Sequence, residues 1–92
     1  MIEMWQEERG KPFYRFQTKN REAANKMKRR NKFKLVAWGV NCDWWIFLAV
    51  FAKPETARKA LKALAGNTVK FNKNEDIFYA TIYFAKKGNE AA

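Results

Sequence analysis

Histidine and serine are absent from the 92-residue chain, and Cys42 is its only cysteine. The chain therefore cannot form a serine–histidine or cysteine–histidine nucleophile, a metal site of paired histidines, a disulfide framework or a Cys/His zinc site. The four glycines are isolated, which excludes a glycine-rich phosphate loop. We expect no enzymatic activity and no cofactor. The lone cysteine favours a reducing compartment, and we expect a cytoplasmic protein.

Two weaker chemical alternatives stay open. Asp43, Glu75 and Asp76 could in principle bind Mg²⁺, although adjacent acids in a turn are more commonly solvated. A tyrosine nucleophile would need an activating neighbour, and the sequence places none beside Tyr79 or Tyr83.

Long hydrophobic runs are also missing. The longest, residues 44–52, has nine residues, about half of what a membrane-spanning helix needs, and it indicates a buried strand. Residues 1–6 contain an acid and no apolar core, so they do not resemble a signal peptide, and we expect no membrane partner. With 48% hydrophobic residues the chain should fold as one domain over residues 12–86, after a partly ordered lead-in (1–11) and before a disordered tail (87–92).

Positive charge, by contrast, is abundant and local. Residues 9–34 hold eleven Lys or Arg residues and a single acid, Glu22, whereas the rest of the chain has eight residues of each sign. Like charges repel one another in a compact protein, so such a segment calls for an anionic partner. Nucleic acid is the commonest partner of a domain with a pI near 10.0.

Residue patterns predict strands over 13–17, 33–40, 44–51 and 77–84, with a turn at 41–43. A helix is predicted from Thr18 or Lys19 to Asn31, and a second from Pro54 to Gly66. Strand, helix, strand, strand, helix, strand is the ferredoxin-like βαββαβ order. We therefore expect an α+β domain with a four-stranded antiparallel sheet backed by two helices and one uncovered sheet face.

Alternation along each predicted strand separates the two faces of this sheet. In the strand over 44–51 the inward set is Trp45, Phe47, Ala49 and Phe51. The uncovered face should carry Phe13, Arg15, Lys34, Trp38, Trp44, Tyr79 and Tyr83. Aromatic rings stack on bases while cations meet phosphates, which favours single-stranded nucleic acid as the ligand. The cations of the first helix could extend its path: Lys26, Lys28, Arg29 and Arg30.

Residues 47–69, FLAVFAKPETARKALKALAGNTV, resemble the third strand, second helix and following loop of RNA-recognition motif domains. The resemblance covers about a quarter of the chain and implies RNA or single-stranded DNA binding across the sheet. The family's octapeptide has aromatic residues at its third and fifth positions, where this chain has Ile46 and Leu48. Its usual stacking pair therefore has no counterpart here.

Two other uses of the uncovered face remain open. An apolar sheet face on a small domain can be a homodimer interface, or residues 1–5 could cover it. The chain could also be a protein-binding regulator or inhibitor, of the kind found in phages and mobile elements, that docks on a host nucleoprotein. Membrane binding through the basic helix is less favoured, because that helix lacks large apolar residues.

Overall fold

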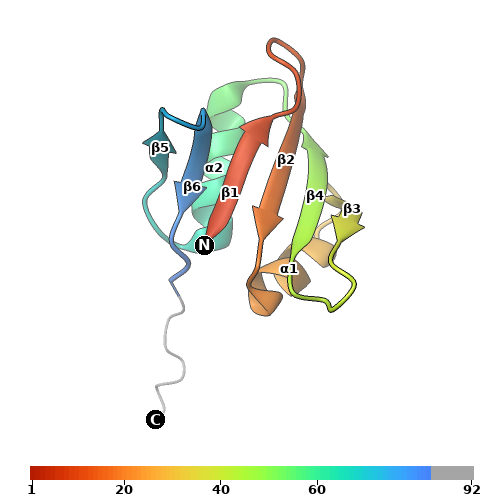
Figure 1. Cartoon of the computed structure of the whole chain (residues 1–92). Coiled ribbons are helices and arrows are strands. Elements are labelled where there is room, and N and C mark those ends of the chain that lie inside the picture. The colour runs from red at the N-terminus through yellow and green to blue at the C-terminus, as the bar shows by residue number, and fades with distance from the viewer. Residues whose placement is uncertain (84–92) are drawn as a thin grey trace.

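Six strands and two helices make up the part of the chain that the computed structural model describes, residues 1–83. The elements are β1 (Ile2–Gln6), β2 (Phe13–Thr18), α1 (Arg21–Lys28), β3 (Lys34–Trp38), β4 (Trp45–Val50), α2 (Pro54–Ala65), β5 (Lys70–Asn72) and β6 (Ile77–Ala80) (Figure 1). The predicted tail (87–92) and the predicted end of the last strand at residue 84 lie outside the described residues.

All six strands form one antiparallel sheet in the order β3-β4-β2-β1-β6-β5. The chain is thus α+β with two helices, as predicted, but the expected four-stranded sheet is wrong. Strand β1, in the predicted lead-in, lies at the centre of the sheet between β2 and β6 (Figure 1). The short strand β5 extends the sheet at one edge.

Burial explains why β1 is a central strand. Ile2 and Met4 are 0% and 1% exposed and point to the helix side, whereas Glu3 and Trp5 between and after them are half-buried on the other side. Burying each of these apolar side chains contributes about 1.5–3 kcal/mol. Residues 1–5 therefore do not fold over the open face of the sheet. They are part of the sheet itself.

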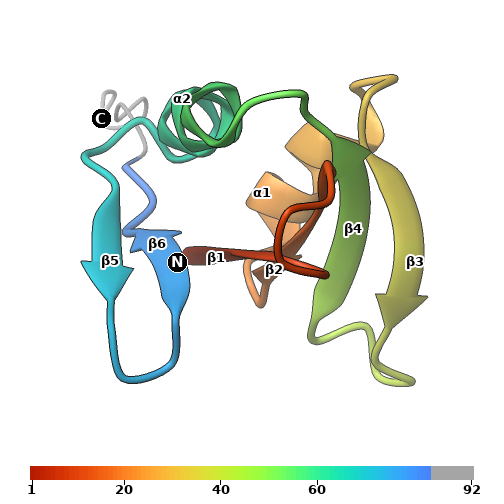
Figure 2. The ribbon, with the colours of Figure 1, turned by 90° about the horizontal axis from the view of Figure 1, so that it is seen from above.

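Both helices lie on the same side of the sheet, which bends around them (Figure 2). The Asn20 side chain caps α1 by accepting a hydrogen bond from the Ala23 amide at 2.9 Å. Pro54 opens α2, and Gly66 ends it with a positive φ of 70°. No helix among residues 1–83 is long and apolar enough to cross a bilayer.

The core fills the space between the helices and this inner side of the sheet. Phe16, Phe33 and Phe51 form an aromatic cluster, in which the Phe16 and Phe33 rings meet edge to face at 4.9 Å between centroids. The predicted inward set of the strand over 44–51 is confirmed, since all four side chains are at most 5% exposed. Helix α1 is shorter than predicted: it ends at Lys28, and Asn31 is exposed in the following turn.

A bulge changes the alternation of β3. Leu35 lies opposite Phe47, but Ala37 lies opposite Ile46, so Val36 is an extra residue and the register shifts. After the shift Trp38 lies opposite Trp45, whose side chain is buried on the helix side. Directly opposed residues share a face of the sheet, so Trp38 faces the helix side at the sheet edge.

Candidate nucleic-acid interface

The sheet side that faces away from both helices, here called the open face, carries one row of alternating ring, cation and apolar side chains. Trp5 lies opposite Arg15, Arg15 opposite Leu48, and Leu48 opposite Lys34. The row therefore crosses β1, β2, β4 and β3. Directly opposed side chains are close enough to touch, so the row forms a continuous strip.

Next to this row, at one end of the open face, lies an exposed apolar surface. Phe13 and Val50 lie opposite each other and are 41% and 48% exposed. The Lys32 ammonium lies at the border of this surface: it donates a hydrogen bond to the Val50 carbonyl at 3.3 Å and lies 5.0 Å from the centre of the Phe51 ring, which is buried on the helix side. We call the exposed part of the open face the end patch, and its members are Phe13, Arg15, Lys34, Leu48 and Val50.

Arg15 is the one cation of the end patch that has an acidic partner. Its guanidinium donates to the Glu7 carboxylate at 2.7 Å, and the Arg15 side chain is 29% exposed. Glu7 fixes the guanidinium beside the Trp5 position and neutralises its charge. A phosphate would have to share Arg15 with this carboxylate, which leaves Lys34 as the uncompensated charge of the end patch.

The remaining predicted side chains of the open face lie farther from this patch. Tyr79 is half-buried on β6, opposite Glu3 on one side and Lys70 on the other. Trp44, also half-buried, packs against Gly39 in the β3–β4 hairpin, where an added Cβ would meet the indole Nε1 at 2.6 Å. Both rings are thus partly covered by their own neighbours.

Two residues predicted for the open face are elsewhere. Trp38 faces the helix side because of the bulge in β3, although it is 56% exposed at the edge. Tyr83 lies beyond the end of β6, where its amide donates to the Ala65 carbonyl at 2.7 Å. This bond holds Tyr83 against the carboxyl end of α2, on the covered side. Both predictions of placement are wrong.

The predicted helix cations lie on the side of the sheet opposite to the open face, because α1 packs on the covered side (Figure 2). Lys26 is half-buried there, and its ammonium donates to the Leu64 carbonyl at 3.2 Å, which links α1 to α2. Lys28, Arg29 and Arg30 are exposed. The predicted open-face rings and the helix cations therefore do not lie on one surface. The positive charge of the helix continues onto the open face only through the turn that joins α1 to β3.

That turn is a run of exposed positive charge, here called the basic turn. Its cations are Lys28, Arg29, Arg30, Lys32 and Lys34. Within residues 1–83 only Arg9 and Arg15 form ion pairs, with Asp76 and Glu7, so every cation of the basic turn lacks a described carboxylate partner. Lysines at the end of α1 also oppose the helix dipole favourably, which accounts for Lys28 but not for the charges that follow.

Sequence reasoning missed Trp5, Lys32 and Val50. Trp5 could have been found, because Ile2 and Met4 alternate with polar residues as in a half-buried strand. Lys32 could not, since its contact with Val50 joins residues far apart in the chain.

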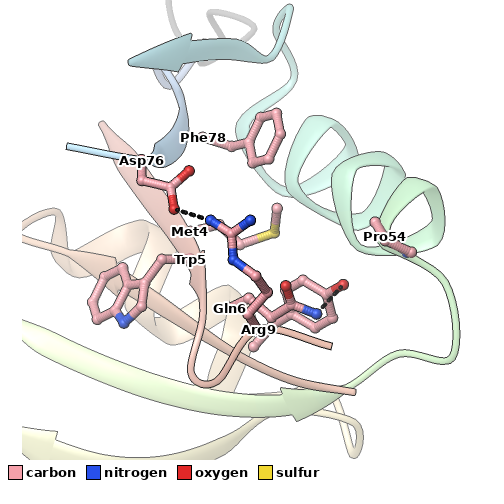
Figure 3. Close-up of a pocket in the computed structure, with 8 residues that line it drawn as sticks. Met4, Trp5, Gln6, Arg9, Pro54, Asp76 and Phe78 are labelled. Carbon is pink, nitrogen blue, oxygen red and sulfur yellow. Dashed lines mark hydrogen bonds and ion pairs between the residues drawn. The ribbon is translucent and has the colours of Figure 1, made fainter. Parts of the chain in front are cut away.

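A cavity of about 250 Å³ lies below the β1–β2 hairpin, between β6 and the start of α2 (Figure 3). Arg9 reaches across it to Asp76 at 3.6 Å, but both side chains are at least 72% exposed, so the pair contributes little. The Trp5 ring is directed away from Arg9 and Phe78 (Figure 3).

No group of three potential metal-binding His, Cys, Asp or Glu residues occurs within residues 1–83, and Asp43, Glu75 and Asp76 form none.

Neither a protein-family model, nor a curated protein, nor a solved structure matches the chain.

Proposed function

We propose that the chain is a non-enzymatic nucleic-acid-binding protein that takes single-stranded RNA or DNA on the end patch and the basic turn. The observation that supports this most is the row from Trp5 through Arg15 and Leu48 to Lys34, which leads into uncompensated cations. A single strand would cross the open face at Phe13 and leave over Lys34 toward Arg30.

Single strands are favoured over duplexes because the rings of this surface need exposed base faces. In a duplex only the terminal pairs offer a free π face, whereas each base of a single strand can stack. Phe13 is exposed enough to accept a base, and such stacking contributes about 1–3 kcal/mol. The half-buried Trp5 offers a second ring on the same face.

Electrostatics should supply most of the affinity. The basic turn has five cations, and each phosphate neutralised on a single strand adds roughly 0.7 to the slope of log affinity against log salt. Arg15 would contribute less than this, because Glu7 already neutralises it. Binding should therefore be tight at low salt and weaken steeply as salt is added.

Fluorescence anisotropy of labelled single-stranded and duplex oligonucleotides at two salt concentrations tests this function. We expect Phe13→Ala to weaken single-strand binding about five- to 150-fold, which is the stacking contribution of one ring. Trp38→Ala is the matched control, because Trp38 is also an exposed ring but faces the helix side. Absence of binding to any oligonucleotide at low ionic strength would refute the proposal.

The resemblance to RNA-recognition motif domains bears on the arrangement of the helices and strands. We propose that β2, α1, β3, β4 and α2 form a ferredoxin-like unit in which β1, antiparallel to β2 and next to it, takes the place of the last strand. Strand β6 is antiparallel to β1 and therefore runs parallel to β2, so it lies outside this unit. Amide hydrogen exchange tests the position of β1. Slow exchange in residues 2–6 is expected, whereas exchange as fast as in residues 7–12 would mean that β1 is not part of the sheet.

We also propose a cytoplasmic location, which the exposed, unpaired Cys42 suits.

The alternative function, a regulator that docks on another protein, has one observation in its favour. Strand β3 is an edge of the sheet, and its apolar side chains Val36 and Trp38 are exposed, as is Val40 after it. Exposed edges of this kind pair readily with another strand, from a partner or a second copy. A complex with a protein that persists at high salt and without nucleic acid would favour this function over the first.

A further inference from the structure

A second basic and aromatic surface lies far along the chain from residues 9–34. It is a groove of about 440 Å³ between α2 and the β5–β6 hairpin. Phe71 lies opposite Phe78, whose side chain packs on the core, so both rings face the helix side of the sheet. The groove is therefore on the covered side, where α2 lies beside β6 (Figure 2), and it shares no residue with the end patch.

Positive charge surrounds this groove. Its cations are Arg58, Lys59 and Lys62 on α2. Lys70 also borders the groove, but it lies opposite Tyr79 and so belongs to the open face of the sheet. Glu55 is the one acid in the lining, and it forms no ion pair with a described residue. None of the three α2 cations is paired with a carboxylate in residues 1–83, and three uncompensated cations along one groove favour an anionic ligand.

The aromatic side chains of the groove are arranged unequally. The Arg58 guanidinium lies 5.4 Å from the centre of the Phe78 ring and so covers it. Phe71 contacts Phe78 at 4.8 Å between ring centres, with the planes tilted by 45°, yet half of Phe71 remains exposed. Phe71 thus offers an aromatic ring that Phe78 supports on one side and that is uncovered on the other. It lies beside the cations of α2.

We propose that this groove binds one nucleotide, with the base stacked on Phe71 and the phosphate held by Lys59 and Lys62. Only a ligand that joins a flat ring to a phosphate uses both properties of the groove. Its volume lies within the roughly 300–1,000 Å³ of small-molecule sites. The site does not depend on nucleic-acid binding at the end patch. Its nucleotide can be free, or it can be the phosphorylated end of a strand.

Chemical-shift mapping by NMR tests this site with five probes: adenosine 5′-monophosphate, adenosine, inorganic phosphate, and a short oligonucleotide with and without a 5′-phosphate. We expect the monophosphate to shift the amides of Arg58, Lys62 and Phe71, and to do so at lower concentration than adenosine or phosphate alone. Shifts caused only by the 5′-phosphorylated oligonucleotide would assign the site to a strand end. Absence of groove shifts with all phosphorylated probes overturns the proposal, as does equal binding of phosphate and the monophosphate.

Two variants test the roles of ring and cation. Phe71→Leu keeps an apolar side chain at an exposed position and should weaken monophosphate binding about five- to 150-fold, the loss of one stacked base. Lys62→Gln should weaken monophosphate binding and leave adenosine binding unchanged. Lys73→Gln, in the turn outside the groove, is the matched control. Unchanged affinity in Phe71→Leu refutes the stacking. Neither groove variant should affect the Phe13-dependent binding of single strands that lack a 5′-phosphate, so the two sites fail or succeed separately.

Discussion

Replacing Met4 with alanine should strongly destabilise the protein, because this side chain sits at the centre of the sheet. Met4 is 1% exposed and lies between Phe16 on β2 and Phe78 on β6. Met-to-Ala changes in cores cost about 2–5 kcal/mol, and a cavity of about 250 Å³ already adjoins Met4. The neighbours can collapse little into the enlarged space, so we expect a loss of about 3 kcal/mol in the free energy of unfolding.

Urea unfolding followed by tryptophan fluorescence and by circular dichroism measures this loss. For a chain of this size about 3 kcal/mol corresponds to a fall in Tm of roughly 12–24 °C. Glu3→Ala is the matched control, since Glu3 is the neighbour on the same strand but points to the open face. Its change should stay below about 1 kcal/mol.

Equal and small effects of the two substitutions would refute the central position of β1.

Deletion of residues 1–6 gives a second test of this position. It removes Ile2 and Met4 from the core and leaves the hydrogen-bonding edges of β2 and β6 unpaired. We expect the truncated chain to lose cooperative unfolding, and a truncated chain as stable as the full one would contradict the structure.

Three further predictions concern local features. Asn20→Ala removes the cap of α1 and should lower the free energy of unfolding by about 1 kcal/mol in urea titrations, with Asn20→Ser as the variant that retains most of it. Gly66→Ala forces a side chain into a positive φ of 70° and should cost about 1–2 kcal/mol in thermal melts. Cys42 is exposed and unpaired, so a maleimide should label the folded protein at one site per chain; labelling only after unfolding would contradict its position.

The sequence was sufficient where local pattern and packing agree. The apolar alternation of β4 predicted its buried side chains. Pro54 and Gly66 predicted both ends of α2. In β4 the residues that define the strand are also the residues that it buries, whereas the ends of α2 are set by the local backbone preferences of Pro54 and Gly66.

The sequence was insufficient where contacts between distant segments decide the structure. Strand β5 has three residues, and only pairing with β6 makes it a strand. The bulge at Val36 moves Trp38 to the other face of the sheet, and its register depends on β4. Tyr83 leaves the strand pattern because its amide bonds to α2. Two of the predicted open-face rings were therefore misplaced, and the rings and helix cations were assigned to one surface although they lie on two layers.

The salt dependence of single-strand binding tests the central claim most directly, namely that the basic turn carries the phosphates. The measurement compares the slope of log affinity against log salt for the wild-type chain, for Arg29→Gln/Arg30→Gln/Lys32→Gln and for the control Lys73→Gln. We predict that the triple variant lowers the slope by about 2, at roughly 0.7 per lost phosphate contact, while the control leaves it unchanged. An unchanged slope in the triple variant would contradict the account.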